Sequence, residues 1–550
     1  MGDDYISPEL RAVEQAFDNA YRSNPLVGAQ RTTATWTLLS VFEDMIVLPL
    51  LGTKSPNVQT SSHRENLLIN GLKHALRWAR ECPTDGRLQP HYDDDRYQNA
   101  SDLLMLGSRY DTIVTIFTYA SRGYCKLTLD GDCVVPVPLI EAEDARYYAY
   151  NRFLQADAEP WSPPSTDLLR LLDEIAESVT VLDHGFRVSI TPRLIARVIQ
   201  EQRPAIDKRF QLPGDWCTTR YSFADLRRVY SALSAIAAVH LNARLIAAQQ
   251  GTESVGFDDA VIVYSVGELH SRVRRYTHVG GDTISAVLED LTYGSRGVRR
   301  PDPALQPLVP VGKDTLLIAP SLILCSSPER NHCVLLNSIA AERDVYAAHV
   351  DRKEAITRTR LVEAATGKGY RPYSGMAAGH QIDLALIDDR SEAVLILELK
   401  WFIGPDEVGE MLARNEELRA GVSQVKTRLS AYRDGAGAIQ GRLGVPPSYR
   451  CSGVVVSQNW IGSQAVQDRA VPIVSLCHFE KALVELDTLT AVSDWLTSRT
   501  YLPTENIHFS VRRGEVRVGD HGAVWWDIES LISGPYEAGL DSGTNSHCPC

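Results

Sequence analysis

The segment QIDLALIDDRSEAVLILELK, residues 381–400, decides the fold that the sequence predicts. It reads as two strands, Gln381–Asp388 and Ala393–Lys400, joined by a tight turn. If the last residue of the first strand pairs with the first residue of the second, Asp383 lies directly opposite Glu398. Directly opposed side chains share one face of a sheet, with Cβ atoms about 5 Å apart.

Lys400 joins these two acids, because alternate side chains of a strand point the same way and Lys400 therefore shares the face of Glu398. Two carboxylates this close repel each other, and a divalent cation with a preference for oxygen ligands, Mg²⁺ or Mn²⁺, relieves the repulsion. A lysine beside such a metal can orient a water molecule or stabilise developing charge. This chemistry suits phosphodiester hydrolysis. The plainer alternative is a hairpin with a surface salt bridge.

The spacing Asp-x14-Glu-x-Lys, formed by Asp383, Glu398 and Lys400, resembles the PD-(D/E)XK nuclease superfamily over roughly residues 340–480. Ile382 stands in place of the proline that gives the family its name, a position that varies within the family. The resemblance implies a restriction-endonuclease-like fold, a mixed sheet flanked by helices.

The resemblance also implies roles for individual residues. Asp383, Glu398 and the main-chain carbonyl of Leu399 are expected to hold Mg²⁺ or Mn²⁺, and Lys400 to orient the attacking water. Gln424 matches by position a glutamine that reaches the active site in several branches of the family; the alternative is an ordinary exposed glutamine. Arg428 stands where one branch carries a tyrosine, four residues after Gln424.

Residues 338–366 read as a long helix that leads into the hairpin, and in nucleases of this type such a helix often supplies a further acid. Glu354 and Glu363 are the candidates. They are nine residues apart and hence on nearly opposite helix faces, so at most one can reach the site. We prefer Glu354 for its place in KEAITRTRLVEAATGKGY. The segment Arg352–Arg371 carries six basic and two acidic residues, which predicts either an approach for a phosphate backbone or a solvated helix face.

Composition limits the classes of function. The chain of 550 residues has a net charge of −13, which argues against coating nucleic acid over a broad surface, so any contact needs a local basic patch. Ten cysteines without a CxxC pair predict a cytoplasmic protein. We expect no signal peptide and no membrane-spanning segment.

The expected organisation is α/β (α+β) in four parts. They are a mainly helical region (1–256), a mixed bridging region with basic loops (257–337), the nuclease-like domain (338–500), and a small β appendix with a disordered tail (501–550). Helices are expected at 7–23, 33–51, 62–81, 99–120, 166–182, 191–203 and 223–250, the last one central and buried, with a hairpin at 124–138. Asp93-Asp94-Asp95 reads as a solvated loop, and Gly421 is expected to interrupt the helix after the hairpin.

Arginines gather in two stretches of the bridging region. Arg272, Arg274 and Arg275 form one, and Arg296, Arg299 and Arg300 in the loop GSRGVRR form the other, with Tyr276 and Tyr293 nearby. They could bind a phosphate backbone. The alternative, slightly favoured, is that they are surface residues or pair with acids elsewhere.

The sequence therefore predicts a cytoplasmic, metal-dependent nuclease, with DNA favoured as substrate by resemblance alone. A bacterial defence or restriction-type effector would fit this layout, with the helical region sensing, recruiting or restraining. Two alternatives stay open: a nucleic-acid- or protein-binding scaffold with a non-catalytic nuclease-like domain, and an RNase of the same fold.

Overall fold

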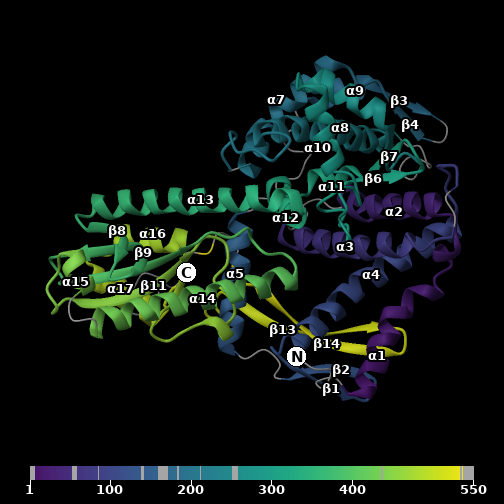
Figure 1. Cartoon of the computed structure of the whole chain (residues 1–550). Coiled ribbons are helices and arrows are strands. Elements are labelled where there is room, and N and C mark those ends of the chain that lie inside the picture. The colour runs from purple at the N-terminus through teal and green to yellow at the C-terminus, as the bar shows by residue number, and fades with distance from the viewer. Residues whose placement is uncertain are drawn as a thin grey trace, which may run out of the picture.

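The computed structural model describes residues 7–52, 58–83, 86–137, 142–158, 171–182, 185–210, 212–250, 258–434, 438–532 and 536. The fold is mixed α/β, with a helical N-terminal region and several small sheets. Figure 1 shows a helical part, with α2, α3, α4 and α8, beside a second part built on a mixed sheet that α13 and α14 flank.

The N-terminal region is helical, as expected. Its helices are α1 (Pro8–Asn19), α2 (Arg31–Gly52), α3 (Val58–Ala79), α4 (Asp94–Ser121), α5 (Ala142–Ala158), α6 (Leu172–Ser178), α7 (Pro192–Arg209) and α8 (Phe223–Gln249). The expected central helix is confirmed, since α8 buries most of its length in the core. Among the described helices, α8 alone has the length and composition of a membrane span, and 72% of its most apolar stretch is buried inside the protein.

Two local predictions in this region are wrong. Asp93 is not part of a solvated loop: its carboxylate accepts the N–H of Arg96 at 2.9 Å and caps α4, whose first turn contains the other two aspartates. The helix expected at 166–182 ends at Ser178, because the β-branched run that follows forms the hairpin β3 (Val179–Leu182) and β4 (Gly185–Val188). Residues 159–170 lie outside the described part of the chain.

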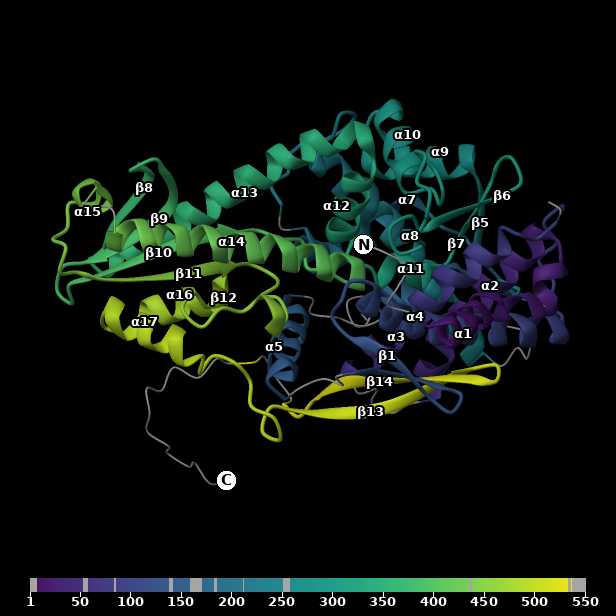
Figure 2. The same cartoon turned by 60° about the horizontal axis from the view of Figure 1, so that its bottom comes forward.

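The expected hairpin at 124–138 is confirmed as β1 (Lys126–Asp130) and β2 (Cys133–Val137). It does not stand alone. The C-terminal hairpin, β13 (Phe509–Val518) and β14 (His521–Ser530), adds to it through a parallel pairing of β14 with β2. The strands near the two ends of the chain therefore share one sheet, which Figure 2 shows below α1 and α5. The expected tail after residue 536 lies outside the described residues.

Residues 258–338 pack into the core of the N-terminal helices. They contain the sheet β5 (Ile262–Ser265), β7 (Thr315–Ile318) and β6 (Leu308–Val311), with helices α9 (Val266–Thr277), α10 (Gly281–Asp290), α11 (Pro320–Leu324) and α12 (Pro328–Ser338). The long helix expected next is confirmed as α13 (Ala340–Gly367), which leads from this core to the second sheet (Figure 1).

The second sheet has the strand order β12-β11-β10-β9-β8. The strands β8 (Arg371–Ala377), β9 (His380–Asp388) and β10 (Ala393–Lys400) are antiparallel neighbours, and β11 (Arg450–Ser457) and β12 (Ile473–Ser475) continue parallel to β10. Helix α14 (Val408–Asp434), followed by α15 (Ala438–Leu443), packs on one face, while α13, α16 (Leu476–Glu485) and α17 (Leu489–Ser498) contact one another and the sheet. This is a mixed sheet flanked by helices.

Candidate functional site

The pairing of β9 with β10 brings Asp383 next to Glu398. The ladder begins with Asp388 opposite Ala393, which confirms the register expected from the sequence. Just beyond the last paired residues, the side chain of Asp383 replaces a main-chain partner: its Oδ2 accepts the N–H of Leu399 at 3.1 Å. The strand pair therefore ends in a half-buried carboxylate rather than in a further rung of the ladder.

The two carboxylates are close enough to affect each other. Burial raises the pKa of Asp383, and repulsion from Glu398 raises it further, although the Leu399 N–H and the Arg428 guanidinium act in the opposite direction. Like-charge repulsion of this kind is what a divalent cation relieves.

Glu398 lies between two cations. One oxygen, Oε1, is 2.8 Å from Lys400 Nζ, and the other, Oε2, is paired with the guanidinium of Arg428, which is buried on α14. Burial acts to lower the pKa of Lys400, but the carboxylates of Glu398, Glu354 and Asp383 together raise it. Lys400 is therefore a charged donor at neutral pH.

Helix α13 adds a third acid. Burial raises the pKa of Glu354. Lys400 and the main-chain N–H of Trp401 act to lower this pKa, and Asp383 and Glu398 act to raise it. These influences place Glu354 beside the cluster. Glu363, the other candidate, is exposed on the opposite side of the helix.

Helix α14 crosses the cluster at Gly421. A Cβ on Gly421 would lie 3.3 Å from Lys400 Cε and 3.5 Å from Glu398 Cγ, so the glycine marks a close approach of helix to strand. The expected interruption of the helix at Gly421 is wrong, because α14 continues through it. Gln424 lies one turn after Gly421 and one turn before Arg428, with an exposed side chain.

The cluster contains oxygen donors of the kind that a hard divalent cation prefers. Three carboxylates and two cations leave a net charge of −1 in a partly buried place. The N–H of Leu399 points to Asp383, and N–H and C=O of one strand residue point to the same side, so the Leu399 carbonyl is directed there too. Within the described residues no three His, Cys, Asp or Glu side chains form a ligand set by themselves. A metal ion bound by Asp383, Glu354 and the Leu399 carbonyl would need water molecules to complete its coordination, as is usual for Mg²⁺.

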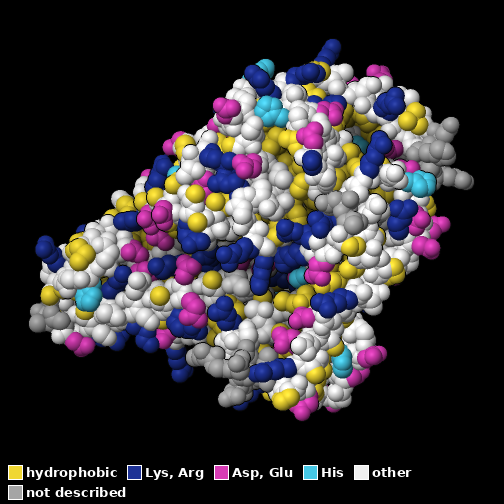
Figure 3. Space-filling model, turned by 45° about the vertical axis from the view of Figure 1, so that its right-hand side comes forward, with side chains coloured by type: hydrophobic (Ala, Val, Ile, Leu, Met, Phe, Trp, Pro, Cys, Tyr) yellow, Lys and Arg dark blue, Asp and Glu magenta, His cyan; other side chains and the backbone are white. Residues whose placement is uncertain are grey.

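Most of the basic residues of the segment Arg352–Arg371, on α13 and at the start of β8, have other partners. Three pair with acids, Arg352 with Asp215, Arg360 with Glu480 and Arg371 with Asp389. Lys353 lies over the ring of Trp401. In the space-filling view, basic side chains gather instead around a recess across the middle of the face shown in Figure 3.

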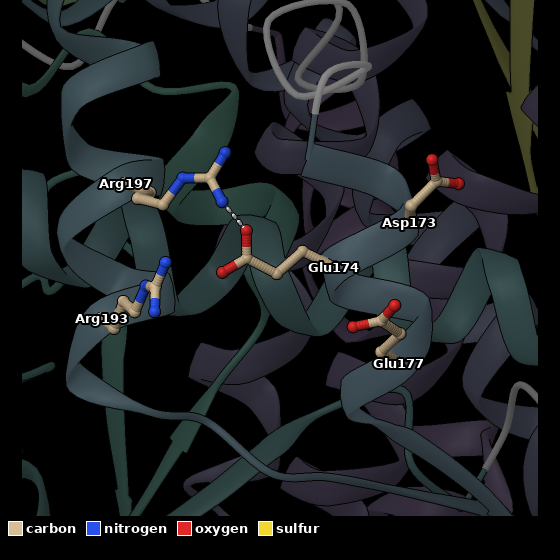
Figure 4. A pocket seen from close by; sticks show the side chains of 5 residues that line it. All are labelled: Asp173, Glu174, Glu177, Arg193 and Arg197. Carbon is tan, nitrogen blue, oxygen red and sulfur yellow. Dashed lines mark hydrogen bonds and ion pairs between the residues drawn. The ribbon is translucent and has the colours of Figure 1, made fainter.

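A polar hollow between α6 and α7 is a weaker candidate. Figure 4 shows that Asp173, Glu174 and Glu177 reach it from one helix and Arg193 and Arg197 from the other, with Arg197 paired to Glu174. The side chains are largely solvent-exposed, and a solvated ion pair of this kind contributes little.

Sequence reasoning missed one member of the cluster, Arg428. In the sequence Arg428 is only a departure from a family pattern, and its position one turn after the exposed Gln424 gives no signal that it is buried beside the sheet. Its partner Glu398 lies 30 residues away, and only the course of α14 brings the two together.

No protein-family model, no curated protein and no solved structure matches this chain.

Proposed function

We propose that this protein is a metal-dependent nuclease of the PD-(D/E)XK type that hydrolyses phosphodiester bonds in DNA. One observation carries the proposal: Asp383, Glu398, Glu354 and Lys400, from two strands and a helix, converge where the β9–β10 pairing ends. Burial is the main cause of the raised pKa values of Asp383 and Glu354, and repulsion from the neighbouring acids adds to it, which supports a partly buried group of carboxylates.

Asp383, Glu354 and the Leu399 carbonyl are the groups that would hold Mg²⁺ or Mn²⁺, with Glu398 reaching it by releasing a cation. The metal would supply Lewis-acid stabilisation of phosphoryl charge and a more acidic water. Lys400 is protonated at neutral pH, so it donates a hydrogen bond to the water or to a phosphate oxygen rather than removing a proton. Arg428 holds Glu398 in position, and Gln424 would reach the substrate from the exposed side of α14.

A plasmid-cleavage assay with Mg²⁺ or Mn²⁺ tests the proposal, with RNA of equal length in parallel. Glu354→Gln should lower the cleavage rate about a hundredfold or more, while the matched change Glu363→Gln on the same helix should leave it unchanged. Lys400→Met should also abolish cleavage. Equal rates for Glu354→Gln and the wild type would contradict the assigned site, and cleavage of RNA alone would identify an RNase.

A non-catalytic scaffold is the second candidate, and the pairing of both Glu398 oxygens with Lys400 and Arg428 favours it. If those pairs persist when metal is added, the domain would bind nucleic acid or a protein without cutting. Tight DNA binding without cleavage under either metal would support this reading.

The helical half would regulate the nuclease. Trp401 and Ile403, directly after the lysine of the site, belong to the core of the N-terminal helices. Lys73 on α3 binds Glu407 at 2.9 Å, so the same segment is anchored again before α14 begins. Such coupling would suit a cytoplasmic bacterial defence or restriction-type effector, an assignment that rests on analogy.

A further inference from the structure

We propose that four arginines form a docking surface for the phosphate backbone of duplex DNA. They are Arg77 and Arg80, at the end of α3, and Arg299 and Arg300, in the loop between α10 and β6; together they are called the arginine surface below. This inference rests on the proposed function and deepens it, because it assigns the place where DNA flanking the scissile bond would lie.

Contacts between α3 and the loop bring the four residues together. Arg77 Nε donates to the carbonyl of Pro301 at 3.1 Å, and its Nη2 donates to the carbonyl of Arg300 at 3.4 Å. Arg80 Nη2 lies 3.8 Å from the position that a Cβ on Gly294 would take. Two segments more than 200 residues apart in sequence therefore present their arginines side by side.

The arginine surface keeps its positive charge. Within the described part of the chain, none of its four guanidinium groups forms an ion pair with an acid, and Arg80, Arg299 and Arg300 are exposed. Arg296 in the same loop differs, because it is mostly buried and binds Asp290 and Glu342. In a chain of net charge −13, a group of four arginines that form no ion pair is a local exception of the kind that nucleic-acid contact requires.

Two acids lie near Arg77, and both are engaged. Asp302 is half-buried, and burial raises its pKa to about 6, although Lys73 and, more weakly, Arg77 oppose this. Glu407 is bound by Lys73, which also lies 3.1 Å from Asp111. Lys73, one helical turn before Arg77, is therefore the main cationic partner of both acids, and Arg77 interacts with them more weakly.

Lys73 also fixes the position of the arginine surface relative to the candidate site, because it lies one turn before Arg77 and binds Glu407. Glu407 follows Lys400 by seven residues, a span of at most about 25 Å. One turn of duplex DNA is about 34 Å long, so a duplex held at Lys400 can reach Arg77 and its neighbours within roughly one turn. Figure 3 shows basic side chains gathered along a recess on one face of the molecule, as a bound duplex would require.

The test measures binding of a fluorescent 30-base-pair DNA duplex by anisotropy, in Ca²⁺ and over a range of salt concentrations. The double variant Arg299→Ala/Arg300→Ala should weaken binding at least about tenfold and reduce the slope of log K against log [salt] by about two, uniformly across sequences. The matched control Arg274→Ala/Arg275→Ala removes two exposed arginines of α9 and should leave both quantities unchanged. Thermal melts of both variants establish that they fold.

The outcomes separate this inference from the proposed function. Unchanged DNA binding by the Arg299/Arg300 variant overturns the arginine surface even if the wild type cleaves DNA. Arginine-dependent binding without cleavage supports the surface and contradicts the nuclease. Absence of DNA binding by the wild type, binding of an RNA duplex alone, or equal competition by polyglutamate each overturns the assignment to DNA.

Discussion

Two groups of buried charges in this protein differ in how well their acids are satisfied. At the junction of α10 and α13, Asp290 accepts hydrogen bonds from Arg220, Arg296 and Tyr221. At the end of the β9–β10 strand pair, Asp383 accepts one main-chain N–H and faces another carboxylate. Three donors therefore surround Asp290, although burial still raises its pKa, whereas Asp383 has one donor and a neighbouring carboxylate.

Glu342 and Glu354 show the same contrast on one helix, α13. Burial raises the pKa of Glu342, but the hydroxyl and N–H of Thr219 and the guanidinium of Arg296 outweigh it, so the pKa is lowered. The pKa of Glu354 is raised because burial outweighs Lys400 and the Trp401 N–H, and Asp383 and Glu398 add a smaller increase. A complete set of partners indicates a structural role, and a deficit indicates a site that binds something further.

The largest expected effect is loss of stability in the group around Asp290. Asp290→Ala removes the acid that Arg220 and Arg296 share, and it leaves the Tyr221 hydroxyl with His332 as its remaining partner. Removing one partner of a buried ion pair costs about 3–5 kcal/mol, so the free energy of unfolding in urea should fall by that amount. A loss below about 1 kcal/mol would remove the basis of the comparison.

The stability of the protein should respond differently to a change in the second group, around Asp383 and Glu398, which is called the incomplete group below. Asp383→Asn removes a charge that repels Glu398 and keeps an acceptor for the Leu399 N–H, so unfolding in urea should show unchanged or slightly higher stability. Cleavage should nevertheless fall about a hundredfold or more, because a metal ligand is lost. Parallel loss of stability and activity would show that Asp383 is structural.

This difference also explains how far sequence reasoning reaches. The strand pair and its register follow from short-range rules, since a tight turn sets the register. The helical period shows that only one of Glu354 and Glu363 can face the sheet, whereas the choice of Glu354 depended on the family resemblance. The positions of the arginines cannot be predicted from such rules. Arg428 meets Glu398, and Arg77 meets the loop before Pro301, only because whole helices lie where they do.

Local ambiguity accounts for other errors. Three consecutive aspartates suit both a solvated loop and a helix N-terminus, and the choice depended on Asp93 capping α4. A glycine in a helical pattern suggests a break, but at Gly421 the absence of a side chain serves a close approach to Lys400. The energetic reason for each residue lies in its neighbours across the fold.

Added metal should stabilise the folded protein by binding at the incomplete group and not at the group around Asp290. At a concentration 100 times the dissociation constant, Mn²⁺ should raise the free energy of unfolding by about 2.7 kcal/mol, and Asp383→Asn should abolish the gain. The gain should shrink as pH falls, because protons compete for carboxyls whose pKa is raised. Thermal melts between pH 5 and 8 measure this.

The metal-free protein should show the reverse pH trend for the same carboxyls. The folded-state pKa values of Asp383 and Glu354 lie above the unfolded ones, so the folded protein binds more protons and loses their contribution as pH rises through the raised values. Glu342 has the opposite sign: its pKa is lowered, and its contribution is lost as pH falls. A metal-induced gain that is independent of pH would contradict a carboxylate site.

The smallest expected effect is that of Gly421→Ala, which distinguishes a role of Gly421 in stability from a role in positioning Lys400. Replacing a helical glycine with alanine gains about 1 kcal/mol in helix propensity, and the new Cβ would meet mainly the flexible Lys400 side chain at 3.3 Å. Gly421→Ala should therefore leave the free energy of unfolding equal or up to about 1 kcal/mol higher, while displacing Lys400 and slowing cleavage about tenfold. Urea unfolding and plasmid cleavage on the same preparation measure both quantities. If the variant gains stability and cleaves at the wild-type rate, the glycine serves helix packing alone and Lys400 does not depend on the close approach of α14.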